Sequence, residues 1–214
     1  MKVTVFGATG ATGREAVRAL LGAGHEVRAF VRGEPEGLPS RVELARGDVL
    51  DFASVDAAVR GSDAVVVTLG IRENPLLVLL RGASKTSTEV RSVGTRNIVE
   101  AMNRHGVKRL VVQTTYGVGA TRGRPSWMWR MIFSSVLRPQ IADTEIQEAL
   151  VRASGLDWVV VQPVGLTDGD PQDLLKSVAG AARSMQVPRR SVGDFLAEAV
   201  TSASYVRECV ALSA

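Results

Sequence analysis

Cysteine and histidine are scarce in this sequence. Cys209 is the only cysteine among 214 residues, and His25 and His105 are the only histidines. A single cysteine forms no internal disulfide, and so few cysteine and histidine side chains do not supply the ligand cluster of a typical metal site. We therefore expect neither a disulfide framework nor a bound metal.

Long apolar runs are absent as well. No segment approaches the ~20 apolar residues that cross a bilayer, and the first residues lack the basic and apolar regions of a secretory signal. No nucleic-acid-binding module is recognisable, and basic and aromatic residues do not alternate along a strand. We expect a cytoplasmic protein that binds neither membrane nor nucleic acid and folds as one domain over residues 1–214.

Acidic residues are missing between residues 101 and 142, although the chain carries 22 of them in total and has a net charge of +4. A positive field over this segment favours an anionic small-molecule ligand. The alternative is that its basic side chains are solvated separately on a helix end and a loop. The basic residues of this segment are Arg104, Lys108, Arg109, Arg122, Arg124, Arg130 and Arg138.

The clearest motif present is a glycine-rich turn, which follows the apolar residues 3–6 and precedes a segment of helical period at 14–23. A strand, a turn and a helix in this order direct unpaired backbone N–H groups and the positive helix end at a pyrophosphate. The three glycines permit the tight turn, the approach of the phosphates and the packing of helix on strand. We predict dinucleotide binding by Gly7, Thr9, Gly10, Ala11, Thr12 and Gly13.

Short β-branched segments alternate with longer segments of helical period, a pattern typical of an α/β protein with a doubly wound parallel sheet. About seven strands are predicted, at residues 3–6, 26–31, 42–45, 64–68, 109–114, 158–162 and 208–212. Helices are predicted at residues 14–23, 53–60, 86–105, 142–154 and 192–203. Ligands bind outside the carboxyl ends of such strands, so the residues directly after each strand are the candidates for a site.

Two segments interrupt the alternation, residues 70–85 and residues 117–140. Both follow predicted strands on the ligand side, and the second contains Trp127, Trp129 and Phe133. A long insertion of this kind is often a lid or a substrate wall. A helical stripe rich in Trp and Met also fits the core or a homodimer contact, which is the alternative for residues 117–140.

Arg32 follows the second predicted strand at the separation where a dinucleotide fold presents its ribose-reading residue. An acidic residue there would bind the ribose 2′-OH of NAD, whereas the planar guanidinium of arginine suits the 2′-phosphate of NADP. We therefore predict NADP(H), with NAD(H) as the alternative. A solvated Arg32, with Glu34 contacting a ribose, is the competing interpretation.

Two further strand ends carry candidate cofactor contacts. Asp48 is placed to accept a hydrogen bond from the adenine amino group and Val49 to cover the ring, unless Asp48 instead caps the helix that begins near residue 53. Thr68, Leu69 and Gly70 end the fourth strand, where a small residue lets the chain pass close to a bound cofactor.

Several more segments accompany these motifs: Gly94-Thr95-Arg96-Asn97-Ile98, Gly106-Val107-Lys108-Arg109, Ser154-Gly155-Leu156-Asp157-Trp158, Gln162-Pro163 and Arg190-Ser191-Val192-Gly193-Asp194-Phe195. With them the chain resembles, over nearly its whole length, the atypical short-chain dehydrogenase/reductase family. The branch is that of NAD(P)H-binding proteins similar to biliverdin-IXβ/flavin reductases and nitrogen-metabolite-repressor-like proteins. The resemblance implies a single-domain Rossmann-type fold with a small C-terminal substrate-side portion.

The resemblance also implies where the chemistry takes place. Thr114, Thr115 and Tyr116 follow the fifth strand, where the hydroxyl groups of the family face the nicotinamide and the substrate. Pro163, Val164 and Leu166 follow the sixth, against the nicotinamide. In the larger family a tyrosine followed four residues later by lysine supplies the proton, but here Ala120 takes the lysine position, and the histidine that some biliverdin/flavin reductases carry after the proline is also absent.

These departures favour chemistry that needs little proton transfer from the protein. The resemblance then implies an NADP(H)-dependent oxidoreductase that passes hydride to a flat conjugated acceptor such as a flavin or a quinone, with Thr115 and Tyr116 orienting or stacking it. A packed loop aromatic is the alternative role for Tyr116. The alternative function is a non-catalytic NADP(H) redox sensor that binds a partner protein. An NADP-dependent epimerase or dehydratase is less favoured, because the chain has little room for a sugar-binding domain.

Overall fold

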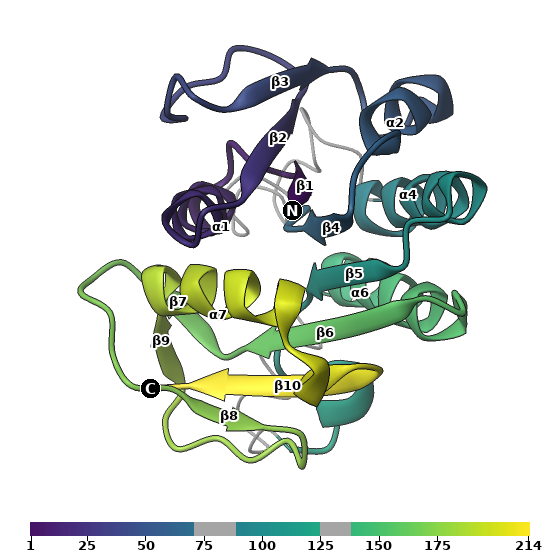
Figure 1. The fold of residues 1–214 in the computed structure, drawn as a ribbon. Helices are drawn as coiled ribbons and strands as arrows, with labels where there is room; N and C mark the ends of the chain where they lie inside the picture. Colours follow the sequence, from purple (N-terminus) through teal and green to yellow (C-terminus); the bar gives the residue numbers. More distant parts are fainter. Residues whose placement is uncertain (71–88, 125–137) are drawn as a thin grey trace.

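The computed structural model describes residues 1–70, 89–124 and 138–214. Its centre is an eight-stranded sheet in the order β3-β2-β1-β4-β5-β6-β10-β8, parallel throughout except for the last pair (Figure 1). The strands are β1 (Lys2–Phe6), β2 (Glu26–Val31), β3 (Glu43–Arg46), β4 (Ala64–Val67), β5 (Arg109–Gln113), β6 (Asp157–Pro163), β8 (Leu175–Ser177) and β10 (Glu208–Ser213).

Helices cover both faces of the sheet (Figure 1). On one face lie α1 (Ala11–Gly22) and α7 (Arg189–Thr201), which pack against each other; on the other lie α2 (Phe52–Val59), α4 (Val90–His105) and α6 (Arg138–Ala153). Each helix buries one apolar stripe against the strands, so the core consists of two apolar clusters separated by the sheet. Leu20 and Phe195 belong to the first cluster, and Val55 and Ile98 to the second.

The doubly wound α/β sheet predicted from the sequence is confirmed, and each of the seven predicted strands is present within one residue at either end. The reason is visible in β4, whose four residues Ala64–Val67 are all buried. Parallel strands covered on both faces consist of continuous β-branched runs, and such runs are recognisable without knowledge of the fold.

Three strands were not predicted. β8 adds an antiparallel edge to the main sheet beside β10, and β7 (Gly165–Thr167) pairs with β9 (Gln186–Pro188) in a small second sheet. Each contains only three residues, too few to display a period of two. Together with their connections they form the small C-terminal portion that follows β6.

The predicted helix starts are less accurate than the strands. α1 begins at Ala11, inside the glycine motif, rather than at residue 14, and α6 begins at Arg138 rather than at residue 142. Residues 86–88 of the predicted helix 86–105 lie outside the described residues. Helix starts depend on which backbone groups find partners, and an apolar period does not report this.

Much of the predicted lid also lies outside the described residues, including Trp127, Trp129 and Phe133, and so do residues 71–85. At its flanks, residues 117–124 contain the short 3₁₀-helix η1 (Gly119–Thr121), and residues 138–140 begin α6. Within the three described ranges, no helix combines the length and apolar character needed to cross a membrane.

Candidate functional site

The glycine turn closes tightly between β1 and α1. Gly7 has a φ of +84°, and a Cβ atom there would lie 2.6 Å from the Thr68 carbonyl oxygen. At Gly13 an added Cβ would lie only 2.1 Å from the carbonyl oxygen of Gly7. The Gly10 N–H donates to that same oxygen at 2.9 Å. The absence of side chains at Gly7 and Gly13 is therefore a steric requirement of the turn.

The N-terminus of α1 suits an anion. Its N-cap residue is Gly10, no side chain caps the helix, and the first turn holds no acidic residue. The first N–H groups of a helix have no intrahelical partners, and the helix dipole adds positive potential at this end. The turn therefore fits the diphosphate of a dinucleotide, with the backbone of Ala11, Thr12 and Gly13 as the donors.

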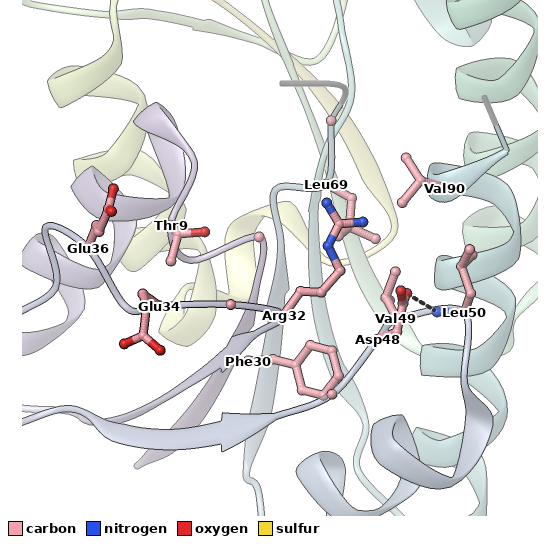
Figure 2. Close-up of a pocket in the computed structure, with 14 residues that line it drawn as sticks. Thr9, Phe30, Arg32, Glu34, Glu36, Asp48, Val49, Leu50, Leu69 and Val90 are labelled. Carbon is pink, nitrogen blue, oxygen red and sulfur yellow. Dashed lines mark hydrogen bonds between the residues drawn. The ribbon is translucent and has the colours of Figure 1, made fainter. Parts of the chain in front are cut away.

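A cavity of about 360 Å³ opens beside this turn, at the carboxyl ends of β1, β2 and β4 (Figure 2). Seven of the predicted cofactor residues line it: Gly7, Thr9, Arg32, Asp48, Val49, Leu69 and Gly70. The remaining lining residues are Phe30, Gly33, Glu34, Glu36, Gly47, Leu50 and Val90. Strand ends separated by up to about sixty residues of sequence thus meet at one site, as parallel topology requires.

Among the described residues that line the cavity, only Arg32 has a cationic side chain. No hydrogen bond or ion pair to another described residue engages its guanidinium, whereas Glu34 lies 3.7 Å from Arg46 Nη1. In Figure 2 the Arg32 side chain extends over the cavity, while Glu34 and Glu36 stand on the side of Thr9. Arg32 is consequently available to an anionic ligand group, and Glu34 is partly neutralised by Arg46.

Asp48 does not cap α2. The capping residue is Asp51, whose carboxylate accepts from the Ser54 N–H at 3.0 Å. Asp48 instead accepts from the Leu50 N–H at 3.0 Å, a local turn drawn as a dashed line in Figure 2. The capping alternative considered for Asp48 is therefore wrong, and its carboxylate remains at the cavity wall.

Val49 is held by residues whose role the sequence did not reveal. Asn97 donates to the Val49 carbonyl at 2.9 Å, and a Cβ at Gly94 would lie 2.8 Å from the Val49 side chain and 3.0 Å from that of Leu69. Gly94 therefore makes room for two cavity-lining side chains. The spacing of Gly94 and Asn97 in the Gly94-Thr95-Arg96-Asn97 motif is the sequence signal that could have indicated their role.

Other predicted cofactor residues lie at the strand ends but not in the lining of the large cavity. The Thr68 hydroxyl donates to the carbonyls of Phe6 and Gly7, at 3.2 and 3.3 Å, so it stabilises the turn. Thr114 is buried, and its Oγ1 has no hydrogen-bond partner in the described chain. Pro163 accepts from the Tyr116 N–H at 2.9 Å, which brings the ends of β5 and β6 together.

The segment after Pro163 is tied into the fold by its backbone. The Val164 N–H donates to Leu212 O at 3.1 Å, and the Gly165 N–H donates to Met185 O at the same distance. Leu166 lies in β7 and pairs with β9. The N–H groups of Val164 and Gly165 are thus already used, and this wall can offer a nicotinamide only its remaining backbone groups and side chains.

A second, smaller cavity of about 100 Å³ lies at the end of β5, between that strand and α6. It is lined by Arg91, Thr115, Tyr116, Val118, Gln140, Ile141 and Thr144. Both predicted chemical residues, Thr115 and Tyr116, are therefore present in its wall. The position beyond β5 is where the resemblance places the acceptor.

The Tyr116 hydroxyl already has a hydrogen-bond partner. The side chain is 5% exposed, and its hydroxyl donates to the Gly180 carbonyl oxygen at 3.1 Å. Burial raises the pKa of this hydroxyl, although nearby Arg124 opposes the shift. The Tyr116 hydroxyl thus donates to the segment after β8, and the residue belongs both to the apolar cluster on the α1 and α7 face and to the wall of the cavity.

Arg91 was not predicted as a site residue. It stands in the first turn of α4, and its Nε donates to the Leu69 carbonyl at 3.2 Å. Burial lowers the pKa of its guanidinium, with the Asp143 carboxylate opposing the shift. No motif marks Arg91 in the sequence, because its burial arises from the packing of α4 against α6.

Four of the five basic side chains that the structure describes between residues 101 and 142 have partners elsewhere in the chain. Arg104 lies 3.5 Å from Asp56, Arg122 lies 3.5 Å from Glu145, and Arg124 donates to the Ala179 carbonyl at 2.6 Å. Arg109 binds backbone carbonyls at the end of α7. Arg130 and the Arg138 side chain lie outside the description. The segment is acid-free in sequence, but its partners come from elsewhere in the chain.

The one cysteine is not a nucleophile. Burial, followed by the nearby Glu148 carboxylate, raises the pKa of the Cys209 thiol to about 12. The thiolate is the reactive form of cysteine, so almost none is present at neutral pH. Across residues 1–70, 89–124 and 138–214, no group of three or more His, Cys, Asp and Glu side chains is arranged to hold a metal ion.

Comparison with known proteins agrees with this geometry. Residues 7–203 match the model of a family described as NAD(P)H-binding. Sterol demethylase protein B of Methylococcus capsulatus is 31% identical over 193 residues, which are 84% of this chain and 55% of that protein. The chain spans 61% and 55% of the length of two of the curated relatives that it matches.

Solved structures with the same fold cover the whole chain. A wide-type short-chain dehydrogenase/reductase from Veillonella parvula in complex with NADP has a TM-score of 0.78 and 17% identity, covering 100% of this chain and 94% of that one. An anaerobillin reductase from Escherichia coli O157:H7 has a TM-score of 0.77 and 18% identity, covering 100% and 97%. At these identities the likeness establishes the fold alone.

Proposed function

Because this chain belongs to a family of NAD(P)H-binding proteins, we propose that it is an NADP(H)-dependent reductase acting on a flat conjugated acceptor such as a flavin or a quinone. The observation that carries this proposal is the pair of neighbouring cavities, one beside the glycine turn and one beside Thr115 and Tyr116. In this proposal the first cavity holds the dinucleotide and the second holds the acceptor.

The state of Tyr116 supports the choice of reaction. A carbonyl reductase requires an acid that protonates the product oxygen, but the Tyr116 hydroxyl already donates to Gly180, and Ala120 stands where the family places lysine. A bound reduced nicotinamide supplies a hydride. The protein then has to position a conjugated acceptor against it and exclude competing geometries, while solvent supplies the proton.

Arg32 supports NADP(H) over NAD(H). Its guanidinium has no partner among the described residues and lines the cavity at the end of β2. A solved structure with this fold holds NADP, and another such protein is a reductase of anaerobillin. Both observations agree with the proposal, in which the 2′-phosphate of the cofactor pairs with Arg32.

An oxidation assay tests the reaction. Purified protein is mixed with NADPH and, in separate reactions, with FMN, riboflavin and a set of quinones, and the loss of nicotinamide absorbance is followed. We expect at least one acceptor to accelerate NADPH oxidation well above the protein-free rate. Tight NADPH binding without oxidation by any acceptor would contradict the reductase and favour the redox sensor.

Arg32→Ala tests the cofactor preference. The substitution removes a charge-assisted contact, so the Kd for NADPH should rise by about 5- to 150-fold, equivalent to about 1–3 kcal/mol, while the Kd for NADH stays nearly constant. Titration calorimetry measures both. Arg41→Ala is the matched control, because Arg41 is an exposed arginine that is not among the residues lining the cavity. Equal losses for the two cofactors would show that Arg32 does not bind the 2′-phosphate.

Tyr116→Phe tests the passive role of the tyrosine hydroxyl. The variant keeps the buried ring and removes only the hydrogen bond to Gly180. We expect kcat/KM to stay within about threefold of the original value and the free energy of unfolding to fall by about 1 kcal/mol. Steady-state kinetics and urea denaturation provide the two readouts. A loss of turnover of two orders of magnitude would instead identify Tyr116 as the proton donor.

A further inference from the structure

The backbone of Arg91 is fixed by a neighbouring helix. The N–H groups of Arg91 and Ser92 donate to the two oxygens of the Asp143 carboxylate, at 3.0 and 3.1 Å. Asp143 is 4% exposed and comes from α6. This contact orients the first turn of α4, so the direction in which the Arg91 side chain leaves the helix is set by the packing of α4 on α6.

The Arg91 guanidinium is incompletely paired. Its Nε donates to Leu69 O at 3.2 Å, whereas its Nη1 is buried without a hydrogen-bond partner. In the described part of the chain, no carboxylate lies within ion-pair distance of the guanidinium. A buried cation without a full set of acceptors is costly, and each such group in a folded protein calls for a cause, such as an absent ligand.

The guanidinium lies close to residues of both cavities. Leu69, whose carbonyl accepts from Arg91, lines the larger cavity, and so does Gly70, where an added Cβ would lie 3.4 Å from Arg91 Nη2. Arg91 itself lines the smaller cavity with Thr115 and Tyr116. Two more buried polar atoms without partners, Gln113 Oε1 and Thr114 Oγ1, belong to the end of β5. Both residues directly precede Thr115, which lines the smaller cavity.

We propose that Arg91 binds an oxyanion, a carboxylate or a phosphate, of the acceptor in the smaller cavity. This inference rests on the proposed function for the identity of that cavity. The cofactor's own phosphates are the other source of such an anion, but the glycine turn and Arg32 serve them at the ends of β1 and β2. Arg91 lies toward β5 and α6, on the far side of Leu69 and Gly70.

A binding experiment that needs no turnover tests this site. The protein is saturated with NADP⁺ and titrated calorimetrically with benzoate and, separately, with benzamide, a neutral molecule of nearly the same shape. We expect benzoate to bind more tightly than benzamide. In Arg91→Met the advantage of benzoate should shrink by about 10- to 100-fold, as expected for loss of a charge-assisted hydrogen bond, and Arg91→Lys should restore part of it.

Two controls separate the alternatives. Arg96→Met removes a positive charge from an exposed position of the same helix and should change neither affinity. The Kd for NADP⁺ is measured for each variant and should stay within about twofold of the original. Thermal melting checks that each variant is folded. If Arg91→Met does not fold, Arg91→Lys is used for the test in its place.

Several outcomes would overturn the inference. They are undetectable benzoate binding at millimolar concentration, equal binding of benzoate and benzamide, or benzoate binding that Arg91→Met leaves unchanged. A higher Kd for NADP⁺ in Arg91→Met would indicate that Arg91 binds the cofactor instead. If Arg91 discriminates benzoate from benzamide but no acceptor oxidises NADPH, the result supports the anion site and contradicts the proposed reductase activity. Turnover without discrimination would show the reverse, a reductase without an anion site at Arg91.

Discussion

Gly13→Ala is expected to abolish measurable cofactor binding and to lower the free energy of unfolding by about 2–4 kcal/mol. The added methyl group would lie 2.1 Å from the Gly7 carbonyl oxygen, 2.9 Å from its carbonyl carbon and 3.0 Å from Ala8 Cα. All three are backbone atoms, which cannot rotate away as a flexible side chain would. Helix α1 must therefore move off the turn, and the N–H groups that face the phosphates move with it.

The control for this prediction stands in the same helix. Gly22 is exposed in the last turn of α1, and a Cβ there would meet no atom within 4 Å. Gly22→Ala should leave NADPH binding unchanged and raise stability by up to about 1 kcal/mol, because alanine has the higher helix propensity. Urea denaturation and calorimetric titration measure both properties. Normal NADPH affinity in Gly13→Ala would refute the steric account of the turn.

Arg109→Met is expected to lower the free energy of unfolding by about 2–4 kcal/mol without weakening cofactor binding. From the start of β5, the Arg109 guanidinium donates to the carbonyls of Ala199, at 2.6 and 3.0 Å, and of Val200, at 3.1 Å, and also to that of Ser202. The last carbonyls of a helix lack intrahelical partners, so this one side chain satisfies the end of α7 and ties it to the sheet.

Lys108 provides the matched control for Arg109. It is the preceding residue, it is exposed, and no hydrogen bond or ion pair to a described residue engages its side chain. Lys108→Met should change the free energy of unfolding by less than about 0.5 kcal/mol, as measured by chemical denaturation. If the two methionine variants lost equal stability, the effect would come from removing a charge and not from the contacts with α7.

The accuracy of the sequence-based site differs between kinds of residue. Gly7, Arg32, Asp48 and Leu69 were predicted together, and they do line one cavity, because each follows a parallel strand. The role of the Thr68 hydroxyl was not predictable, since it depends on the distance to the Phe6 and Gly7 carbonyls across the sheet. Strand ends can be located from a local pattern, but the partner of a side chain at a strand end cannot.

The sequence by itself determined the class of fold, the strands of the parallel sheet and the glycine turn. Those features follow from hydrophobic period and from glycine spacing, which are properties of neighbouring residues. Only the tertiary structure decided that the Tyr116 hydroxyl is bound to Gly180, 64 residues away, that Arg109 serves the end of α7, and that Arg91 is buried with an unpaired nitrogen. The physical reason is that hydrogen-bond partners and burial depend on how distant segments pack, and a local pattern contains no record of that packing.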